Sequence, residues 1–224
     1  MKAKTLSATF ILATGFVLLL YNGGSRFTMG LMLKPMADDL NWTRATLSLT
    51  VTLFMVVSAV VLPVIGRLVD RYRIRTVLLA SVLLSSASVA LMSVIQTPVQ
   101  AVVLYGVLFA LATAGTSIAP IGVMISRWFP TRLGLANSIA ISGMGAGQLV
   151  IILLLTAQLE SIGWRGAFLV LAALGLLLIV PLTLLSIPEP ALGAAETPNA
   201  PLGNTKSELS HSDLLRDLKL WYLL

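Results

Sequence analysis

The chain has 224 residues, of which 57% are hydrophobic and 11% are charged, and its mean hydropathy is +0.95. Soluble globular domains carry about 25% charged residues, so this composition excludes a soluble domain and indicates a protein of the lipid bilayer. The net charge of +6 is compatible with two partners, a nucleic acid or an anionic membrane surface. The absence of cysteine excludes disulfides and thiol-ligated metals.

Apolar runs of about 20 residues, the length that crosses ~30 Å of hydrocarbon, predict six transmembrane helices. They cover residues 6–33, 46–65, 76–95, 99–125, 133–159 and 167–187. The first run follows Lys2 and Lys4 and could be a signal peptide, but it has no A-x-A-like cleavage site. We therefore interpret it as a retained helix, and the sequence predicts an all-α membrane protein.

Positive charge gathers in the connections that follow the second and fourth predicted spans. The segment 65–79 holds four arginines, and Arg127 and Arg132 precede the fifth span. The connections that sum to zero are 34–44, 96–98 and 160–165. By the positive-inside rule, the amino terminus and the segment 188–224 are predicted to be cytoplasmic. Positive charge spread over short loops at one membrane face argues against a nucleic-acid partner.

The composition changes after the sixth predicted span. Residues 188–212 are rich in Pro, Gly, Ala and acidic residues, which predicts a flexible cytoplasmic linker. Residues 213–224 are apolar again and are interpreted as the truncated start of a seventh helix. The alternative is a short amphipathic helix on the cytoplasmic surface, with Trp221 and Tyr222 at headgroup level.

The first three predicted spans are similar to the second three. Residues 22–33 (NGGSRFTMGLML) align with residues 114–125 (AGTSIAPIGVMI) at matching Gly, Ser, Gly and Met positions. The two repeats are predicted at about 5–95 and 97–187. Because each repeat has an odd number of spans, the two are inverted relative to each other, as in secondary transporters built from inverted repeats.

The segment GRLVDRYRIRTV (66–77) resembles the motif G-x-L-x-D-R-x-G-R/K-R/K-x-V, which lies between the second and third helices of the major facilitator superfamily. The matching residues are Gly66, Leu68, Asp70, Arg71, Arg75 and Val77. Arg73 stands where the motif has glycine, and Ile74 stands where it has a basic residue. The position of the segment between the second and third predicted spans also fits the resemblance.

Residues 23–48, 126–148 and 163–177 are similar to the branch of that superfamily that contains monocarboxylate porters and oxalate/formate antiporters. Family members carry twelve spans in two halves, so the resemblance implies an amino-terminal half. It also implies transport of a small organic anion, such as a monocarboxylate, across a bacterial inner membrane, completed by another half or a second copy. The alternatives are a drug or metabolite efflux transporter and an inactive or scaffold six-span fragment.

The resemblance also implies a conformational latch formed by Gly66, Asp70, Arg71 and Arg75, whose polar contacts close the cytoplasmic side of the outward-open state. Asp70 can cap a helix amino terminus, and Arg71 can pair with a carboxylate. Both interactions break when the bundles rock apart. The alternative is that these charges only fix the orientation of the protein in the membrane.

Arg26 is the one ionisable residue well inside a predicted span. Exposing it to lipid costs at least ~2.5–3.5 kcal/mol, so it is expected to face the bundle interior or a water-filled cavity. Asn22 lies one turn away on the same face, and a guanidinium can hold a carboxylate through two hydrogen bonds. We predict a substrate site from Arg26, Asn22, Ser117 and Gln148. The alternative is that Arg26 extends to the outer headgroups.

The predicted spans contain no Asp or Glu, and the GMGAG segment (143–147) lacks the proline of drug/proton antiporters. These features favour anion uniport, symport or exchange over drug efflux, with H⁺ coupling left open. The small residues at 143–147 favour close helix packing over ligand contact. The single histidine, His211, lies outside the spans, so no enzymatic activity, cofactor or metal site is expected.

Overall fold

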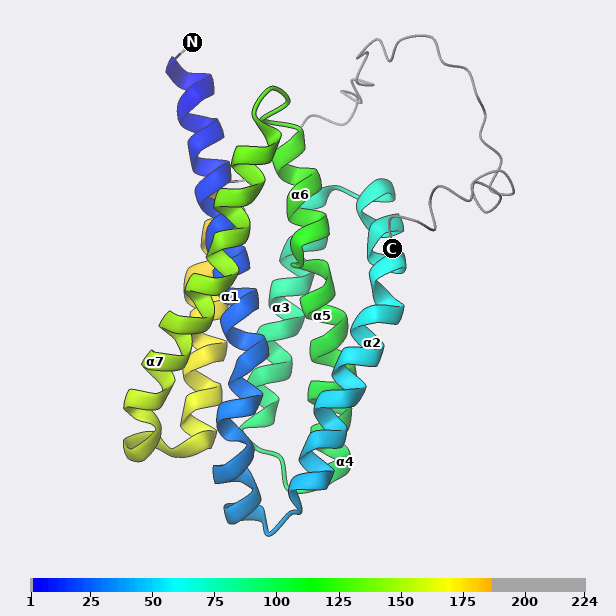
Figure 1. Cartoon of the computed structure of the whole chain (residues 1–224), viewed down its shortest axis with the longest axis vertical. Helices are drawn as coiled ribbons and strands as arrows, with labels where there is room; N and C mark the ends of the chain where they lie inside the picture. Colours follow the sequence, from blue (N-terminus) through cyan, green and yellow to red (C-terminus); the bar gives the residue numbers. More distant parts are fainter. Residues whose placement is uncertain (1, 187–224) are drawn as a thin grey trace, which may run out of the picture. The chain divides into compact units, whose positions relative to one another are not determined.

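The computed structural model describes residues 2–186, which form helices joined by short connections, without a strand in that range (Figure 1). The α-helices are α1 (Lys2–Leu40), α2 (Arg44–Arg71), α3 (Ile74–Met92), α4 (Pro98–Ala101), α5 (Ala110–Gly115), α6 (Ile118–Ser126), α7 (Leu133–Leu174) and α8 (Val180–Ser186). Two π-helical segments, η1 (Val102–Phe109) and η2 (Gly175–Ile179), continue α4 into α5 and α7 into α8.

Five continuous helical stretches in the described residues are long and apolar enough to cross a membrane. They are Ala8–Leu40, Ala45–Arg71, Ile74–Met92, Pro98–Ser126 and Leu133–Ser186. The last has 54 residues, and its length of about 80 Å at 1.5 Å per residue is more than twice the thickness of the hydrocarbon.

Gly163 breaks this last stretch into two spans. Its φ of 65° and ψ of 178° are not helical, and glycine adopts a positive φ without the steric penalty of a side chain. Figure 1 shows the chain reversing its direction within α7, between its green and yellow parts. The described residues therefore contain six spans, as predicted, and residues 163–165 (GWR) start the sixth.

Two helices continue beyond the predicted apolar runs. The first helix extends to Leu40 through Pro35, and the second extends to Arg71 rather than to residue 65. The segment 65–79 is therefore mostly helical rather than a loop, since α2 and α3 are joined only through residues 72–73. Hydropathy locates the edge of the lipid, whereas a charged helix can continue into water until a residue breaks it.

Three expectations about domains are not settled by the described residues. The predicted linker at 188–212 and the predicted seventh helix at 213–224 both lie outside them. The repeat boundaries, at about 5–95 and 97–187, stay a prediction.

Glycines bring α1 and α7 into backbone contact. A Cβ added to Gly147 would overlap the carbonyl oxygen of Leu20, and one added to Gly143 would overlap that of Phe16. On the opposite helix, a Cβ on Gly23 would overlap the carbonyl oxygen of Met144. Helices in lipid gain little from the hydrophobic effect, so such close packing is a main source of association. The packing role predicted for residues 143–147 is thus confirmed.

We predict that Gly147→Ala lowers the stability of the folded bundle by about 1–3 kcal/mol, because the new methyl group forces α1 and α7 apart. The measurement is the unfolding temperature of the purified protein in detergent. Gly145→Ala is the matched control, since a Cβ at Gly145 meets nothing within 4 Å. Equal unfolding temperatures for the two variants would contradict the packing argument.

Candidate functional site

Arg26 lies in α1, about two turns before the end of the predicted apolar run at residue 33, and its side chain is half-buried. The guanidinium carbon is 5.3 Å from the ring centroid of Phe54 on α2. Within residues 2–186, no hydrogen bond or ion pair to this guanidinium is found. The contact with Phe54 places the charge against a neighbouring helix, which favours the interior position over extension to the headgroups. The N–H donors of Arg26 remain available to an anion.

Tyr105, on η1, lies beside the same position of α1. Its hydroxyl donates a hydrogen bond of 2.7 Å to the backbone carbonyl oxygen of Arg26. Sequence analysis missed Tyr105 and Phe54, because aromatic residues inside apolar runs are usually packing residues. The four-residue spacing of Tyr105 and Phe109 in one run is the signal that could have marked an aromatic face.

Asn22 is fully buried and ties the first span to the fourth. Its Nδ2 donates to the carbonyl oxygen of Thr113 at 2.9 Å and to Oγ1 of Thr116 at 2.8 Å. These acceptors lie where the fourth span is interrupted between α5 and α6, at residues 116–117. The amide of Asn22 thus connects the first span to the fourth at this interruption. Its Oδ1 is buried without a hydrogen-bond partner in the described residues.

The other two predicted site residues are less closely connected to Arg26. Ser117 is half-buried and its hydroxyl has no hydrogen-bond partner among residues 2–186, and Gln148 is half-buried on α7. Ser117 follows Thr116, so the Asn22 contact brings it near the first span. No hydrogen bond within the described part of the chain joins Ser117 or Gln148 to Arg26. Their membership of one site stays a prediction.

The residues of the predicted latch lie at facing helix ends. Gly66, Asp70 and Arg71 are exposed in the last turns of α2, and Arg75 is half-buried in the first turn of α3. A Cβ on Gly66 meets nothing within 4 Å. Arg71, as a cation in the last turn, complements the negative end of the helix dipole. The exposed Asp70 carboxylate is accessible to a partner outside these helices.

Comparison with known proteins decides the family. A model of the Major Facilitator Superfamily matches residues 15–224. The chain belongs to the major facilitator superfamily. The resemblance of residues 66–77 is thereby confirmed, and the six spans form part of the fold of this superfamily of transporters.

Curated relatives of this chain are longer than the chain itself. It is 26% identical over 188 residues to the uncharacterized MFS-type transporter YcxA of Bacillus subtilis, covering 84% of this chain and 46% of the relative. Identity to the oxalate:formate antiporter of Oxalobacter formigenes is 26% over 218 residues, covering 96% and 50%. Identity to monocarboxylate transporter 14 of Mus musculus is 26% over 170 residues, covering 76% and 33%. The chain thus spans half or less of the length of these relatives.

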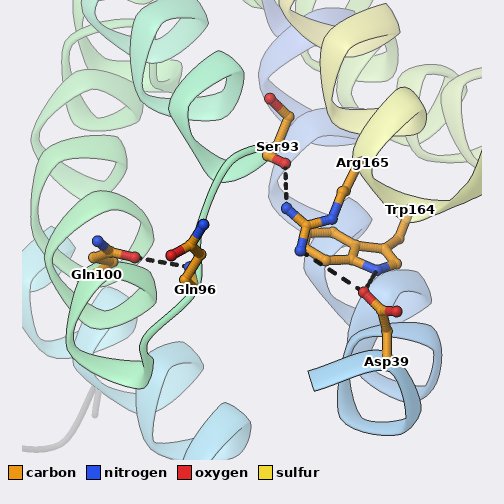
Figure 2. Close-up of polar contacts among 6 residues, drawn as sticks. All are labelled: Asp39, Ser93, Gln96, Gln100, Trp164 and Arg165. Carbon is orange, nitrogen blue, oxygen red and sulfur yellow. Dashed lines mark hydrogen bonds and ion pairs between the residues drawn. The ribbon is translucent and has the colours of Figure 1, made fainter.

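At the end of the bundle opposite the latch, a polar cluster joins three spans of this major facilitator chain (Figure 2). Asp39, at the end of α1, accepts a hydrogen bond of 3.1 Å from Nε1 of Trp164 and lies 3.8 Å from Nη2 of Arg165. Arg165 also donates to the carbonyl oxygen of Ser93 at 2.9 Å, and its guanidinium carbon is 4.4 Å from the ring centroid of Trp164. We call these residues the Asp39 cluster.

The Asp39 cluster gives a role to individual charges in two connections that have no net charge. Asp39 belongs to the connection 34–44 and Arg165 to the connection 160–165, and the two charges pair with each other. Their side chains are 53% and 42% exposed, so the ion pair itself contributes at most about 1 kcal/mol. The hydrogen bond from the Trp164 indole and the one to the Ser93 carbonyl are directional, and they join the ends of the first, third and sixth spans.

We predict that Asp39→Ala destabilises the bundle by about 0.5–1.5 kcal/mol, because the Trp164 indole loses its acceptor and Arg165 loses its counter-charge. The unfolding temperature in detergent measures this, and part of the loss should disappear in high salt, which screens exposed charges. Asp38→Ala is the control, since Asp38 is exposed and takes no part in the cluster. An equal effect of both variants would refute the assignment.

Proposed function

We propose that this chain is part of a secondary transporter that moves a small organic anion, such as a monocarboxylate, across a bacterial inner membrane by alternating access. One observation carries the proposal: the guanidinium of Arg26, inside the first span, lies over the ring of Phe54 and has no counter-charge among the described residues. An unpaired cation is costly in low dielectric, and an anionic substrate relieves that cost while it is bound.

A carboxylate is the anion that this site fits best. A guanidinium is planar and presents paired N–H groups, which match the two oxygens of a carboxylate. Relatives named for oxalate and formate and for monocarboxylates support the same substrate class. The buried hydroxyl of Ser117, the Oδ1 of Asn22 and the half-buried amide of Gln148 are proposed to contact the substrate or bound water.

The positions of the acidic residues support exchange or uniport through these six spans. Within residues 2–186, the carboxylates are those of Asp38, Asp39, Asp70 and Glu160, all near helix ends. A proton-coupled mechanism therefore needs a carboxylate or histidine outside this range. The distribution of Arg and Lys supports a cytoplasmic amino terminus and a cytoplasmic segment 188–224.

Gly66, Asp70, Arg71 and Arg75 are proposed to form the cytoplasmic latch of the outward-open state. The exposed ends of α2 and α3 carry these residues, so a second six-helix unit could contact them without rearranging the first. A charged contact at the helix end is strong when water is excluded and is lost when the two units separate.

We predict that Arg26→Lys and Arg26→Ala raise the half-saturation concentration for substrate by about tenfold or more, since each loses charge-assisted hydrogen bonds to a carboxylate. The complete encoded protein is reconstituted in liposomes, and uptake of acetate, lactate and oxalate is measured. Arg127→Lys, an exposed arginine between α6 and α7, is the control. Parent-like uptake by both Arg26 variants, or uptake of none of these anions by the parent, would sink the proposal.

We predict that Asp70→Asn lowers the maximal transport rate by about five- to hundredfold, the range expected when one state of a conformational equilibrium loses its stabilising contact. The amount of protein inserted in the membrane should stay at the parent level. Glu160→Gln, which neutralises another exposed carboxylate, is the control. Normal flux in Asp70→Asn would leave only the orientation role for this segment.

A further inference from the structure

Three helical segments meet at Arg26. Phe54 of α2 lies under the guanidinium, with 5.3 Å between the guanidinium carbon and the ring centroid. Tyr105 of η1 binds the carbonyl oxygen of the same residue. The face of an aromatic ring carries partial negative charge, so it attracts a cation that lies over it. An arginine side chain on a helix otherwise samples many rotamers, and the ring restricts it.

The ring of Phe54 is itself held in place. Its centroid is 5.2 Å from that of Tyr105 and 5.7 Å from that of Phe109, and these two rings are stacked at 4.9 Å. Phe54 is 4% exposed, Tyr105 is 1% exposed and Phe109 is fully buried. Gly106 permits this approach, because a Cβ there would be only 3.2 Å from Cδ2 of Leu53 on α2. The guanidinium therefore rests on a rigid surface rather than on a mobile side chain.

Tyr105 adds a restraint on the backbone. Its hydroxyl bond of 2.7 Å acts on the carbonyl of the residue that carries the guanidinium, 79 residues away in sequence. A buried phenol needs a hydrogen-bond partner, and this one uses α1 rather than its own helix. The segment that carries Tyr105 and Phe109 is the π-helix η1 (Val102–Phe109). Short π-helical segments are rare and occur frequently at functional sites.

We propose that Phe54 and Tyr105 are positioning residues for Arg26, which hold its guanidinium so that its N–H edge meets the carboxylate of the transported anion. The inference rests on the proposed function and adds the residues that orient the binding group. A guanidinium over a ring face is attracted without being neutralised, so its charge and its N–H donors stay available to the anion. A preorganised donor loses less freedom on binding, so it binds the anion more tightly.

The test compares substitutions that remove one contact at a time. Phe54→Leu removes the ring but keeps an apolar side chain, Phe54→Trp keeps an aromatic face, and Tyr105→Phe removes only the hydroxyl. Phe168→Leu is the matched control, because Phe168 is a fully buried ring in the sixth span that does not contact Arg26. Uptake of lactate and of oxalate is measured with the complete encoded protein in liposomes, over a range of concentrations.

Phe54→Leu is expected to raise the half-saturation concentration by about three- to thirtyfold, the range of a cation–π contact, with a smaller change in maximal rate. Phe54→Trp should restore the parent value, and Tyr105→Phe should raise it by about two- to tenfold. A merely structural role would lower the amount of folded protein and leave half-saturation unchanged, as expected for Phe168→Leu.

A double-mutant cycle separates positioning from independent damage. If Phe54 acts through Arg26, the effects of Phe54→Leu and Arg26→Lys on half-saturation are not additive; additive effects overturn the inference. An unchanged half-saturation in Phe54→Leu and Tyr105→Phe also overturns it, while a raised value in Arg26→Lys leaves the proposed function standing. Should Arg26→Lys and Arg26→Ala both match the parent, the proposed function fails and the inference fails with it.

Discussion

The structure depends on one constraint, which is that lipid offers no hydrogen bonds to the chain. Every polar backbone group inside the hydrocarbon must find a partner within the protein, and this is why the described spans are helical. Where the fourth span is interrupted at residues 116–117, the buried amide of Asn22 supplies donors from another helix. The two hydrogen bonds of Asn22 fix the first span against the fourth at this point.

The first span organises the six-helix unit, because it contacts each neighbour by a different kind of interaction. Glycine contacts hold α1 to α7, Asn22 holds it to α5, and Arg26 and its carbonyl hold it to α2 and η1. The Asp39 cluster holds its end to the third and sixth spans. Interior packing and hydrogen bonds of this kind resist small internal rearrangements. The arrangement favours movement of the six spans as one body.

Hydropathy and charge along the sequence are enough to locate the spans and the one arginine inside a span. Long apolar runs gave six spans, and a lone cation among apolar residues pointed to Arg26. Helix ends were less visible, since they depend on caps such as Thr43, whose side chain accepts a bond from the Thr46 amide. Phe54 and Tyr105 were hard to single out, because aromatic residues are ordinary in apolar runs and their contact with Arg26 joins different helices. Pairings across the bundle are set by tertiary packing.

Two arginines of the described chain show what distinguishes a fixed cation from an available one. Arg165 lies over the ring of Trp164, pairs with Asp39 and donates to the carbonyl oxygen of Ser93, so its charge has a counter-charge and one of its donors has an acceptor. Arg26 also lies over an aromatic ring, that of Phe54, but no carboxylate within residues 2–186 pairs with it. A permanent internal carboxylate would compete with an anionic substrate for the guanidinium. An aromatic ring avoids this competition, because it orients the cation without neutralising it.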